Sequence, residues 1–357
     1  MRYYCRNSAI SMPFPVSKLH GEIDGQPVNI YTLRNSCGMK AKVSELGAHL
    51  ISVMLDEQEL TIGHDSFEGW RNNSDYYLGA TCGRFGNRIA DGKFQIGKSR
   101  YELATNNSPA DIPCHLHGGP NGYHTKIWRG EALSDQNGQG VRFTLHSPDG
   151  DEAYPGNMDI TVTYWLNDNN ELSWHVEATT DQPTPVNLIN HTYWNLSGDF
   201  DSPITDHLIQ IHADYFLPTN AGMIPTGEIR SVLDTPMDFT RPRVIGKHMH
   251  TPFEPTEIAG GYDHCWVLRD HHEKKPESHT AAIVYHPGTG ITLEVITNQP
   301  GIQFYSGNYL TGPFVHRSGL CLETGGFPDS PNQSNFPSSI LRPGETYQHD
   351  LIWRLSC

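Results

Sequence analysis

The feature that most constrains the fold is a strict alternation of apolar and polar residues in short runs. From residue 158 to residue 166 an apolar side chain stands at every second position, and the alternation resumes over 172–178 after the turn-rich Asn167–Asn170. Successive side chains of an extended chain point to opposite faces, so each run buries one face of a strand. The two runs predict an antiparallel hairpin with one face in the core.

Similar short runs, separated by glycine and proline, recur along the chain. Alternation is also present over 141–145 and 291–295, and Gly92 and Gly97 frame two short strands around 94–96 and 101–103. Helical periodicity is scarce, and 34 Gly and 25 Pro interrupt the sequence throughout. Many short strands joined by frequent turns predict an all-β fold, a large antiparallel β-sandwich with few short helices.

No change of composition divides the chain into parts. The polar stretch 269–277 is interpreted as a surface loop within a domain, and no internal repeat with a period of roughly 20–50 residues is present. We therefore predict a loosely ordered N-terminal tail at residues 1–18 and a single β-sandwich domain over residues 19–357.

The net charge limits the classes of binding partner that we expect, and the cysteine content predicts where in the cell the protein is located. The 357 residues include 25 Lys+Arg and 40 Asp+Glu, a formal charge of −15. Nucleic acids and anionic membranes bind positive protein faces, so this charge argues against both as partners. No stretch approaches the ~18 apolar residues of a membrane span. The first residues contain no continuous apolar region, so we expect no secretory signal. Seven scattered cysteines without a CxxC pair predict reduced thiols and a cytoplasmic location.

Two glycine-rich segments carry polar residues that suit an oxygen-rich ligand. In Gly83–Ile89, Asn87 and Arg88 either donate hydrogen bonds to a ligand or are solvated side chains of a connection; the segment lacks the ending of a P-loop. His115 and His117 share one face of an extended strand, as some metal-binding histidines do, but no acidic residue follows at the expected spacing. We therefore expect His117 to be a neutral donor or an ordinary hydrogen-bonded histidine, and we expect no metal.

Two further segments hold candidates for proton transfer. His191 lies in Asn187–Leu196, a run rich in amides, hydroxyls and rings, and the ordinary histidine pKa of about 6.5 suits acid–base chemistry. Apolar positions 320 and 322 should point into the core, so Cys321 and Glu323 face the other way. A carboxylate among apolar neighbours is costly unless paired, and its pKa is shifted. The alternatives are a histidine satisfied by amides and a glutamate paired with an arginine.

Two smaller features are Asp263, which stands just before the apolar run 265–268, and Gln303, which stands between apolar and aromatic residues. Each is compatible with a structural or a binding role. The chain has no GxSxG elbow, so a Ser-His-Asp triad is not indicated. It also has neither a P-loop nor a dinucleotide fingerprint, so we expect no nucleotide cofactor.

Taken together and in this order, the segments resemble the aldose 1-epimerase, or galactose mutarotase, family. The resemblance extends from about residue 20 to the C-terminus almost without gaps. One departure is that the family usually has a polar residue, often Gln, directly after Leu-Glu-Thr, whereas Gly325 and Gly326 follow here. The matching stretches are GRFGNRIADGKF, HLHGGPNGYHTKIW, SPDGDEAYPGN, TPVNLINHTYWNLSG, YFLPTNAGMIPTGE, GYDHCWVL, QPGIQFYSGN, LETGGFPDSPNQ and LRPGETYQHD.

The resemblance implies a galactose mutarotase-like β-sandwich of the supersandwich type and an isomerase that needs neither cofactor nor metal. By motif, His191 would be the general acid and Glu323 the general base for the ring opening of free aldohexoses such as galactose and glucose. We expect Asp263 to raise the pKa of His191 and so keep it charged. The matching motifs further imply that sugar hydroxyls are bound by Asn87, Arg88, His117, Asp263 and Gln303.

Other functions remain open on the sequence alone. A non-catalytic carbohydrate-binding or sugar-sensing protein would keep the amides and rings but would not need a matched acid and base. A hexose-6-phosphate 1-epimerase would need a cluster of basic groups, which the charge of −15 disfavours. The hypothesis of a metal-dependent enzyme rests only on the twenty scattered histidines. We expect an aldose as the partner and a monomer or a homodimer, and the preferred aldose stays open.

Overall fold

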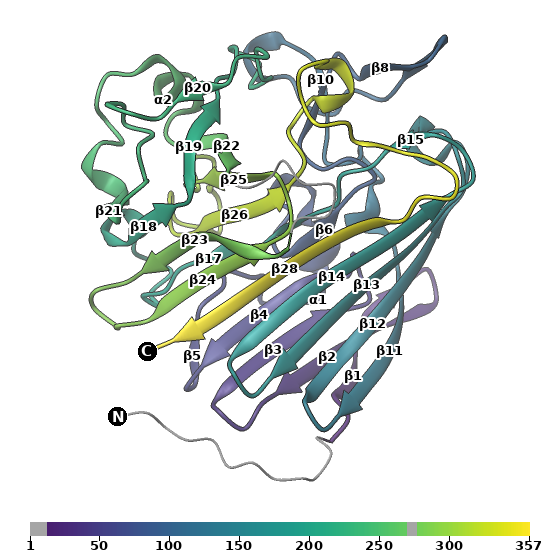
Figure 1. The fold of residues 1–357 in the computed structure, drawn as a ribbon. Helices are drawn as coiled ribbons and strands as arrows, with labels where there is room; N and C mark the ends of the chain where they lie inside the picture. Colours follow the sequence, from purple (N-terminus) through teal and green to yellow (C-terminus); the bar gives the residue numbers. More distant parts are fainter. Residues whose placement is uncertain (1–12, 270–276) are drawn as a thin grey trace.

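Nearly all regular structure in the computed structural model, which describes residues 13–269 and 277–357, is β-strand (Figure 1). Two short α-helices occur within the described residues, α1 (Phe67–Arg71) and α2 (Glu254–Ala259). Gly260 ends α2 with a φ of 65°, a left-handed conformation that glycine adopts without steric cost. The all-β fold with few short helices that the sequence predicts is confirmed.

The largest sheet has nine strands and contains the predicted hairpin. Met158 pairs with Thr180 and Leu166 with Leu172, so the two alternating runs face each other in register. The short turn between the two runs is the turn-rich segment found in the sequence. The strands lie in the order β11 (Arg129–Asp135), β12 (Gly138–Ser147), β13 (Met158–Asn167), β14 (Glu171–Thr180), β28 (Tyr347–Ser356), β24 (Thr292–Thr297), β23 (His279–Tyr285), β18 (Leu208–Ile211) and β21 (Arg243–Val244).

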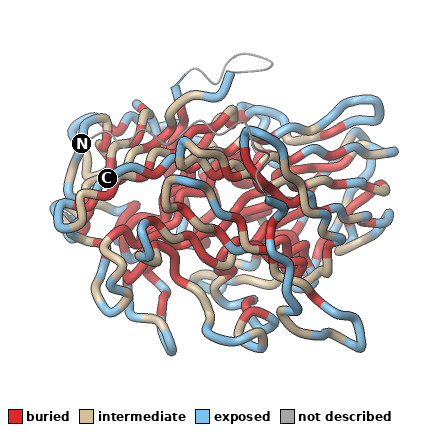
Figure 2. The backbone as a smooth tube through the Cα atoms, turned by 90° about the horizontal axis from the view of Figure 1, so that it is seen from below, coloured by how far each residue is buried: buried red, intermediate tan, exposed pale blue. Residues whose placement is uncertain are grey.

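A five-stranded sheet packs against the β11–β14 part of this sheet. Phe143 of the large sheet meets Tyr31 of the smaller one edge to face, with ring centroids 6.0 Å apart, and both belong to one continuous apolar core. Figure 2 shows buried segments through the middle of the molecule and exposed segments in the loops around it. The strands of this sheet are, in order, β1 (Val16–Ile23), β2 (Gln26–Arg34), β3 (Met39–Ser44), β4 (Leu50–Leu55) and β5 (Gln58–Glu59).

A six-stranded sheet carries the residues that matter most for function. One face contributes large side chains such as Trp266, Phe304 and Leu322 to the same apolar core. Because side chains alternate along a strand, the residues between these point to the opposite face. The strands are, in order, β17 (Tyr193–Trp194), β26 (Leu320–Gly325), β25 (Gly301–Tyr305), β22 (Asp263–Leu268), β19 (Ala213–Leu217) and β20 (Arg230–Ser231).

Four two-stranded pairs complete the regular structure of the described residues. The pair of β6 and β16 positions His191 at the end of a strand, and the pair of β7 and β10 begins at Arg88. The predicted strands around 94–96 and 101–103 are β8 and β9. The pairs are β6 (Ala80–Cys82) with β16 (Ile189–His191), β7 (Arg88–Ala90) with β10 (Cys114–Leu116), β8 (Lys93–Ile96) with β9 (Ser99–Glu102), and β15 (Thr184–Pro185) with β27 (Ile340–Leu341).

Some expectations fall partly outside the described residues. Of the tail expected at residues 1–18, residues 1–12 lie outside the described residues, and residues 16–18 belong to β1. Most of the polar loop at 269–277 also lies outside. No helix of the described chain is long and apolar enough to cross a membrane. The single domain over 19–357 stays a prediction.

Cysteine pairing corrects one expectation. Cys37 is disulfide-bonded, whereas the sequence predicts reduced thiols throughout. The prediction fails at this position because scattered spacing does not show which cysteines meet in the fold. Within the described residues Cys82, Cys114, Cys265, Cys321 and Cys357 are free.

The contact between the nine-stranded and the five-stranded sheet predicts an effect on stability. Phe143 is fully buried, so Phe143→Ala leaves a cavity between the layers and should lower the free energy of unfolding by about 3–5 kcal/mol. Leu233→Ala, at a side chain that is 68% exposed, is the control and should change it by less than about 0.5 kcal/mol. Urea unfolding followed by fluorescence measures both, and equal effects would contradict this packing.

Candidate active site

Pairing within the six-stranded sheet brings residues from four strands into one row. Residues opposite each other in neighbouring antiparallel strands project to the same face. Asp263 of β22 is opposite Tyr305 of β25, and Tyr305 is opposite Cys321 of β26. Cys321 is also opposite Tyr193 of β17. We call the side of the sheet that carries this row the cavity face.

A second row lies beside the first on the cavity face. Glu323 follows Cys321 by two residues and is opposite Gln303, two residues before Tyr305. The period of two therefore places Glu323 and Cys321 side by side, as the alternation of the sequence predicts. Both are buried, and so is Gln303.

The cavity face borders a cavity of about 750 Å³, within the size range of ligand pockets. Gln303 is the one predicted site residue that does not line it. Its side-chain amide instead donates a hydrogen bond to Asp263 Oδ1 at 2.7 Å, so Gln303 orients the carboxylate of Asp263. The predicted site residues that do line the cavity are Asn87, Arg88, His117, His191, Asp263 and Glu323.

His191 and Glu323 form a buried pair. Nε2 of His191 lies 3.5 Å from Oε1 of Glu323, and the two side chains are only 7% and 4% exposed. Burial lowers the pKa of His191 to about 4. Burial, and next the charge of Asp263, raise the pKa of Glu323 well above its usual range, although Arg88 opposes them. In the substrate-free cavity the proton of the pair therefore resides on Glu323.

This placement corrects the expected effect of Asp263. The sequence predicts that Asp263 raises the pKa of His191, but burial dominates there and lowers it. The charge of Asp263 acts on Glu323 instead. Burial also raises the pKa of Asp263 itself, against the Arg88 charge and the hydrogen bond from Gln303.

Two hydrogen bonds join His117 and Asn87. The amide of Asn87 donates to Nδ1 of His117 at 3.1 Å, and the amide of His117 donates to the Asn87 carbonyl at 3.1 Å. Because Nδ1 accepts, the proton of the neutral ring belongs on Nε2, as expected for a neutral donor. Burial lowers the pKa of His117 well below its usual range, which keeps the ring neutral.

The same hydrogen bond bears on a metal at this site. His117, His191 and Glu323 lie close enough together to share an ion. A metal on Nε2 of His117 would force a proton onto Nδ1, which would then face the donating amide of Asn87. The donor set of the cavity therefore does not suit a metal ion.

Arg88 supplies positive charge to the cavity. It is the only Lys or Arg among the described residues that line the cavity, whereas Asp75, Asp263 and Glu323 are its acidic residues. Nε of Arg88 donates to Oδ1 of Asn107 at 3.2 Å, which fixes the guanidinium beside the cavity. Its charge acts to lower the pKa of both Asp263 and Glu323.

Sequence reasoning missed several residues that line the cavity. Tyr77, Asn107 and Tyr309 come from loops that no sequence pattern marks as functional, and Met223 lies in a stretch that matches the family but received no role. Tyr77 is buried with a φ of 55°, an unusual backbone for a bulky residue, and its ring lies 4.6 Å from that of His117. A left-handed tyrosine is not recognisable from sequence, because Asp-Tyr-Tyr-Leu is unremarkable in composition.

The glycines that follow Leu-Glu-Thr form a tight contact. The amide of Gly326 donates to Oδ1 of Asn187 at 2.8 Å. A side chain at Gly325 would bring its Cβ to within 2.8 Å of the same oxygen. The departure from the family pattern is thus matched by Asn187, which occupies the space beside the strand.

Comparisons with known proteins show the family of this chain. A family model for aldose 1-epimerase matches residues 29–354. Galactose mutarotase of Bos taurus is 42% identical over 306 residues, 84% of each chain, and that of Homo sapiens is 40% identical over the same span. Aldose 1-epimerase of Escherichia coli strain K12 is 37% identical over 338 residues, 91% of this chain and 94% of that protein.

Solved structures share the fold. A galactose 1-epimerase from Lactobacillus acidophilus NCFM superposes with a TM-score of 0.85 at 27% identity, covering 98% of this chain and 99% of the other. An aldose epimerase homologue from C. elegans gives a TM-score of 0.79 at 28% identity, covering 91% and 98%. The fold and these relatives thus define a β-sandwich isomerase. More particularly, the chain belongs to the aldose 1-epimerase family and has mutarotase function.

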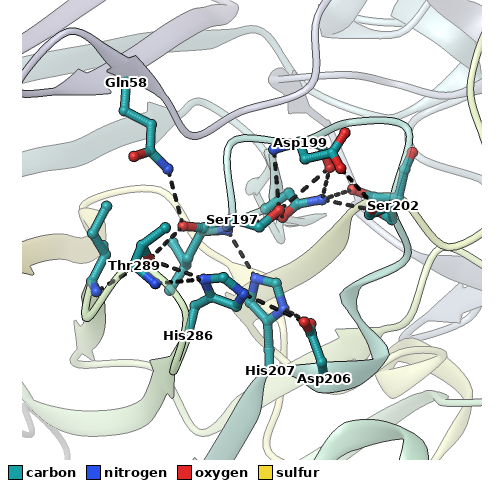
Figure 3. Close-up of polar contacts among 12 residues, drawn as sticks. Gln58, Ser197, Asp199, Ser202, Asp206, His207, His286 and Thr289 are labelled. Atoms are coloured by element: carbon teal, nitrogen blue, oxygen red, sulfur yellow. Dashed lines mark hydrogen bonds and ion pairs between the residues drawn. The ribbon is translucent and has the colours of Figure 1, made fainter.

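A second cluster of histidines lies away from the cavity (Figure 3). Oδ1 of Asp206 lies 2.8 Å from Nδ1 of His207, and Oδ2 lies 3.4 Å from Nε2 of His286. The centroids of the two imidazole rings are 4.7 Å apart. The other nitrogen of each ring accepts a backbone amide, from Leu196 at 3.0 Å and from Thr289 at 3.2 Å. Each histidine must therefore point an N–H at Asp206, which leaves no lone pair for a metal ion.

This cluster makes a prediction about stability. Partial burial acts to raise the pKa of Asp206, but the hydrogen bonds and charges of His207 and His286 outweigh it and hold the pKa below the ordinary 3.8. The stabilisation is therefore present at neutral pH and lost as the pH falls below that value. Asp206→Ala should lower the unfolding free energy by about 1 kcal/mol at pH 7.

Chemical denaturation at pH 7, 5 and 3 measures the difference between the two proteins, which should shrink at pH 3. Asp201→Ala, at a nearby exposed residue, is the control. Zinc should leave both melting temperatures unchanged. A rise with zinc in the wild type that is lost in Asp206→Ala would show that the cluster binds metal after all.

Proposed function

We propose that this protein interconverts the α and β anomers of free aldohexoses such as galactose and glucose, with His191 as general acid and Glu323 as general base. The observation that carries the proposal is the buried pair itself, 3.5 Å apart on the floor of a cavity with polar walls. The mammalian relatives that are named galactose mutarotases support galactose as a substrate.

The reaction needs one proton to leave the sugar and another to arrive. The Glu323 carboxylate takes the proton of the O1 hydroxyl while Nε2–H of His191 protonates the ring oxygen O5. The C1–O5 bond breaks, and the open aldehyde rotates about C1–C2. The pair then closes the ring on the opposite face with the transfers reversed. Each transfer contributes roughly 10²–10⁴-fold to the rate.

The bound sugar prepares the pair for this exchange. In the substrate-free cavity the proton resides on Glu323, which burial favours. Sugar hydroxyls donate hydrogen bonds to the carboxylate, and Arg88 already favours its charged form. Binding therefore moves the proton to His191 without any exchange with solvent, because the pair holds one proton in both states.

The remaining predicted residues bind hydroxyl groups. His117 offers an Nε2–H donor and Asp263 a carboxylate acceptor. Asn87, directly before β7, and Arg88, the first residue of β7, add further donors. Gln303 acts through Asp263, whose orientation it fixes.

Two other functions are weaker. A 6-phosphate substrate would meet one arginine and three acidic residues in the cavity. A sugar-sensing protein would not need to keep a carboxylate and an imidazole together out of water, which is costly. The cytoplasmic location and the choice between monomer and homodimer stay predictions.

Replacing either member of the pair should stop turnover. Glu323→Gln and His191→Asn remove the base and the acid, so kcat for mutarotation should fall at least about 100-fold while sugar binding stays measurable. Polarimetry of freshly dissolved α-galactose, α-glucose and glucose 6-phosphate gives the rates, and calorimetry gives binding. The free sugars should be the better substrates.

Asp201→Ala serves as the surface control. If Glu323→Gln keeps more than about a tenth of the wild-type kcat, Glu323 is not the base. A wild type that binds sugar without accelerating mutarotation would favour the sugar-sensing alternative. Preference for the phosphorylated sugar would favour the 6-phosphate epimerase.

The pH dependence of kcat/KM follows from the substrate-free pair. Below the His191 pKa of about 4 the pair gains a second proton and Glu323 no longer yields a usable base. Well above the usual range of a glutamate the pair loses its only proton. We expect kcat/KM to be level near pH 5–7 and to fall below about pH 4. An acid limb at the ordinary histidine pKa of about 6.5 would contradict this.

A further inference from the structure

We propose that Asn107 is a positioning residue: as a neutral acceptor it holds the Arg88 guanidinium in one orientation and leaves its positive charge and both Nη groups to the sugar. The proposal rests on the sugar-binding role proposed for Arg88. Its basis is the geometry around the guanidinium and the attachment of the loop that carries Asn107.

The backbone of Arg88 is fixed on both sides. Its amide donates to Oδ1 of Asn87 at 2.8 Å, and its carbonyl accepts from the amide of Asp329 at 2.8 Å. Arg88 is also opposite Leu116 of β10. The side chain therefore starts from a fixed point, but a long arginine side chain still has many rotamers, so a further contact has to select one of them.

The contact with Asn107 selects the orientation of the guanidinium. Nε of Arg88 donates to Oδ1 of Asn107 at 3.2 Å. A guanidinium is planar and its N–H groups point in fixed directions, so a bond at Nε fixes the plane and the edge formed by the two Nη groups. Within residues 13–269 and 277–357, no oxygen atom accepts from either Nη and no carboxylate forms an ion pair with Arg88. Because Arg88 lines the cavity, this edge is available to a ligand.

The loop that carries Asn107 is attached to β10 independently of this side chain. The amide of Asn107 donates to the carbonyl of Cys114 at 3.3 Å, and its carbonyl accepts from the amide of Cys114 at 2.8 Å. The side chain of Asn106 bonds to both backbone groups of Leu116, at 2.7 and 3.0 Å. Since Leu116 is opposite Arg88, one strand places the loop and the arginine relative to each other. Replacing the Asn107 side chain should therefore leave the loop in place.

The acceptor that holds Arg88 carries no charge of its own. Arg88 is only 8% exposed, and a charged side chain that is buried to this degree usually has a partner of opposite charge. The amide oxygen of Asn107 accepts the hydrogen bond without offsetting the charge. The charge therefore acts on the cavity: burial raises the pKa of Tyr77, Asp263 and Glu323, and Arg88 opposes this rise in each of them.

The orientation and the charge of Arg88 serve different parts of the proposed reaction. A guanidinium that is already oriented binds sugar hydroxyls without first losing its rotamer freedom, which strengthens sugar binding. Its uncompensated charge favours the carboxylate form of Glu323, which takes the proton of the O1 hydroxyl. Loss of the acceptor at Asn107 should therefore affect KM, whereas a charged acceptor at this position should affect kcat.

The test compares Asn107→Ala with Asn107→Asp by polarimetry of mutarotation, with calorimetry for sugar binding. Alanine removes the acceptor but leaves the charge, so KM should rise on the order of tenfold while kcat falls less than about threefold. Aspartate keeps an acceptor of the same shape but pairs with the cation. In that variant kcat should fall on the order of tenfold, because the added negative charge opposes the carboxylate form of Glu323, and KM should stay within about twofold.

A double-mutant cycle separates positioning from a merely structural role. If Asn107 acts through Arg88, Asn107→Ala in an Arg88→Ala background should change KM by less than about twofold. The matched control is Cys114→Ala. The thiol of Cys114 is the other donor to Oδ1 of Asn107, at 3.4 Å, and its removal leaves the bond to Arg88 intact. Cys114→Ala should keep the wild-type kcat and KM.

Three results would overturn the proposal: an unchanged KM in Asn107→Ala, the same rise in KM with and without Arg88, or identical effects of alanine and aspartate. If Asn107→Ala does not fold, Asn107→Asp decides, and a wild-type kcat in that variant would overturn the proposal. Arg88→Ala with wild-type kcat and KM would refute the role proposed for Arg88 and this inference with it. A failure of the proposed base would appear separately, as turnover retained in Glu323→Gln.

Discussion

The contact between a carboxylate and an imidazole, both withdrawn from water, is the interaction on which the rest of the site depends. Burial disfavours the charged form of each group, so Glu323 holds the proton and His191 is neutral. Arg88 and Asp263 act on this balance in opposite directions, since one favours the carboxylate and the other opposes it. The surrounding polar residues thus tune one shared proton.

Much of the fold could be predicted because alternation is a local property. The hairpin over 158–180 and the placement of Cys321 beside Glu323 both follow from a period of two. What lies opposite Glu323 across the sheet is not local, so sequence could not show that Gln303 supports Asp263 rather than lining the cavity. The prediction that the pKa of His191 is raised was wrong for a related reason, because the burial that lowers this pKa is a property of the whole fold.

The backbone around the cavity is unusual in a consistent way. Tyr77, Asn87 and His117 all line the cavity, and all have φ values between 51° and 63°. Such left-handed conformations cost energy in residues other than glycine and persist where the surroundings enforce them. For Asn87 and His117, two mutual hydrogen bonds do so, one between their backbones and one from the Asn87 amide to Nδ1 of the His117 ring. The result is a ring whose free N–H faces the cavity.

The two faces of the six-stranded sheet have a consequence for how such a protein can change. Every second residue of β22, β25 and β26 lies on the cavity face, and the residues between them lie on the face toward the core. Substitutions on one face can alter the choice of sugar while the other face keeps its packing. An insertion or deletion of one residue in these strands would instead exchange the two sets. Lineages of this fold are therefore expected to diversify by point replacement here and to gain or lose residues only in the loops.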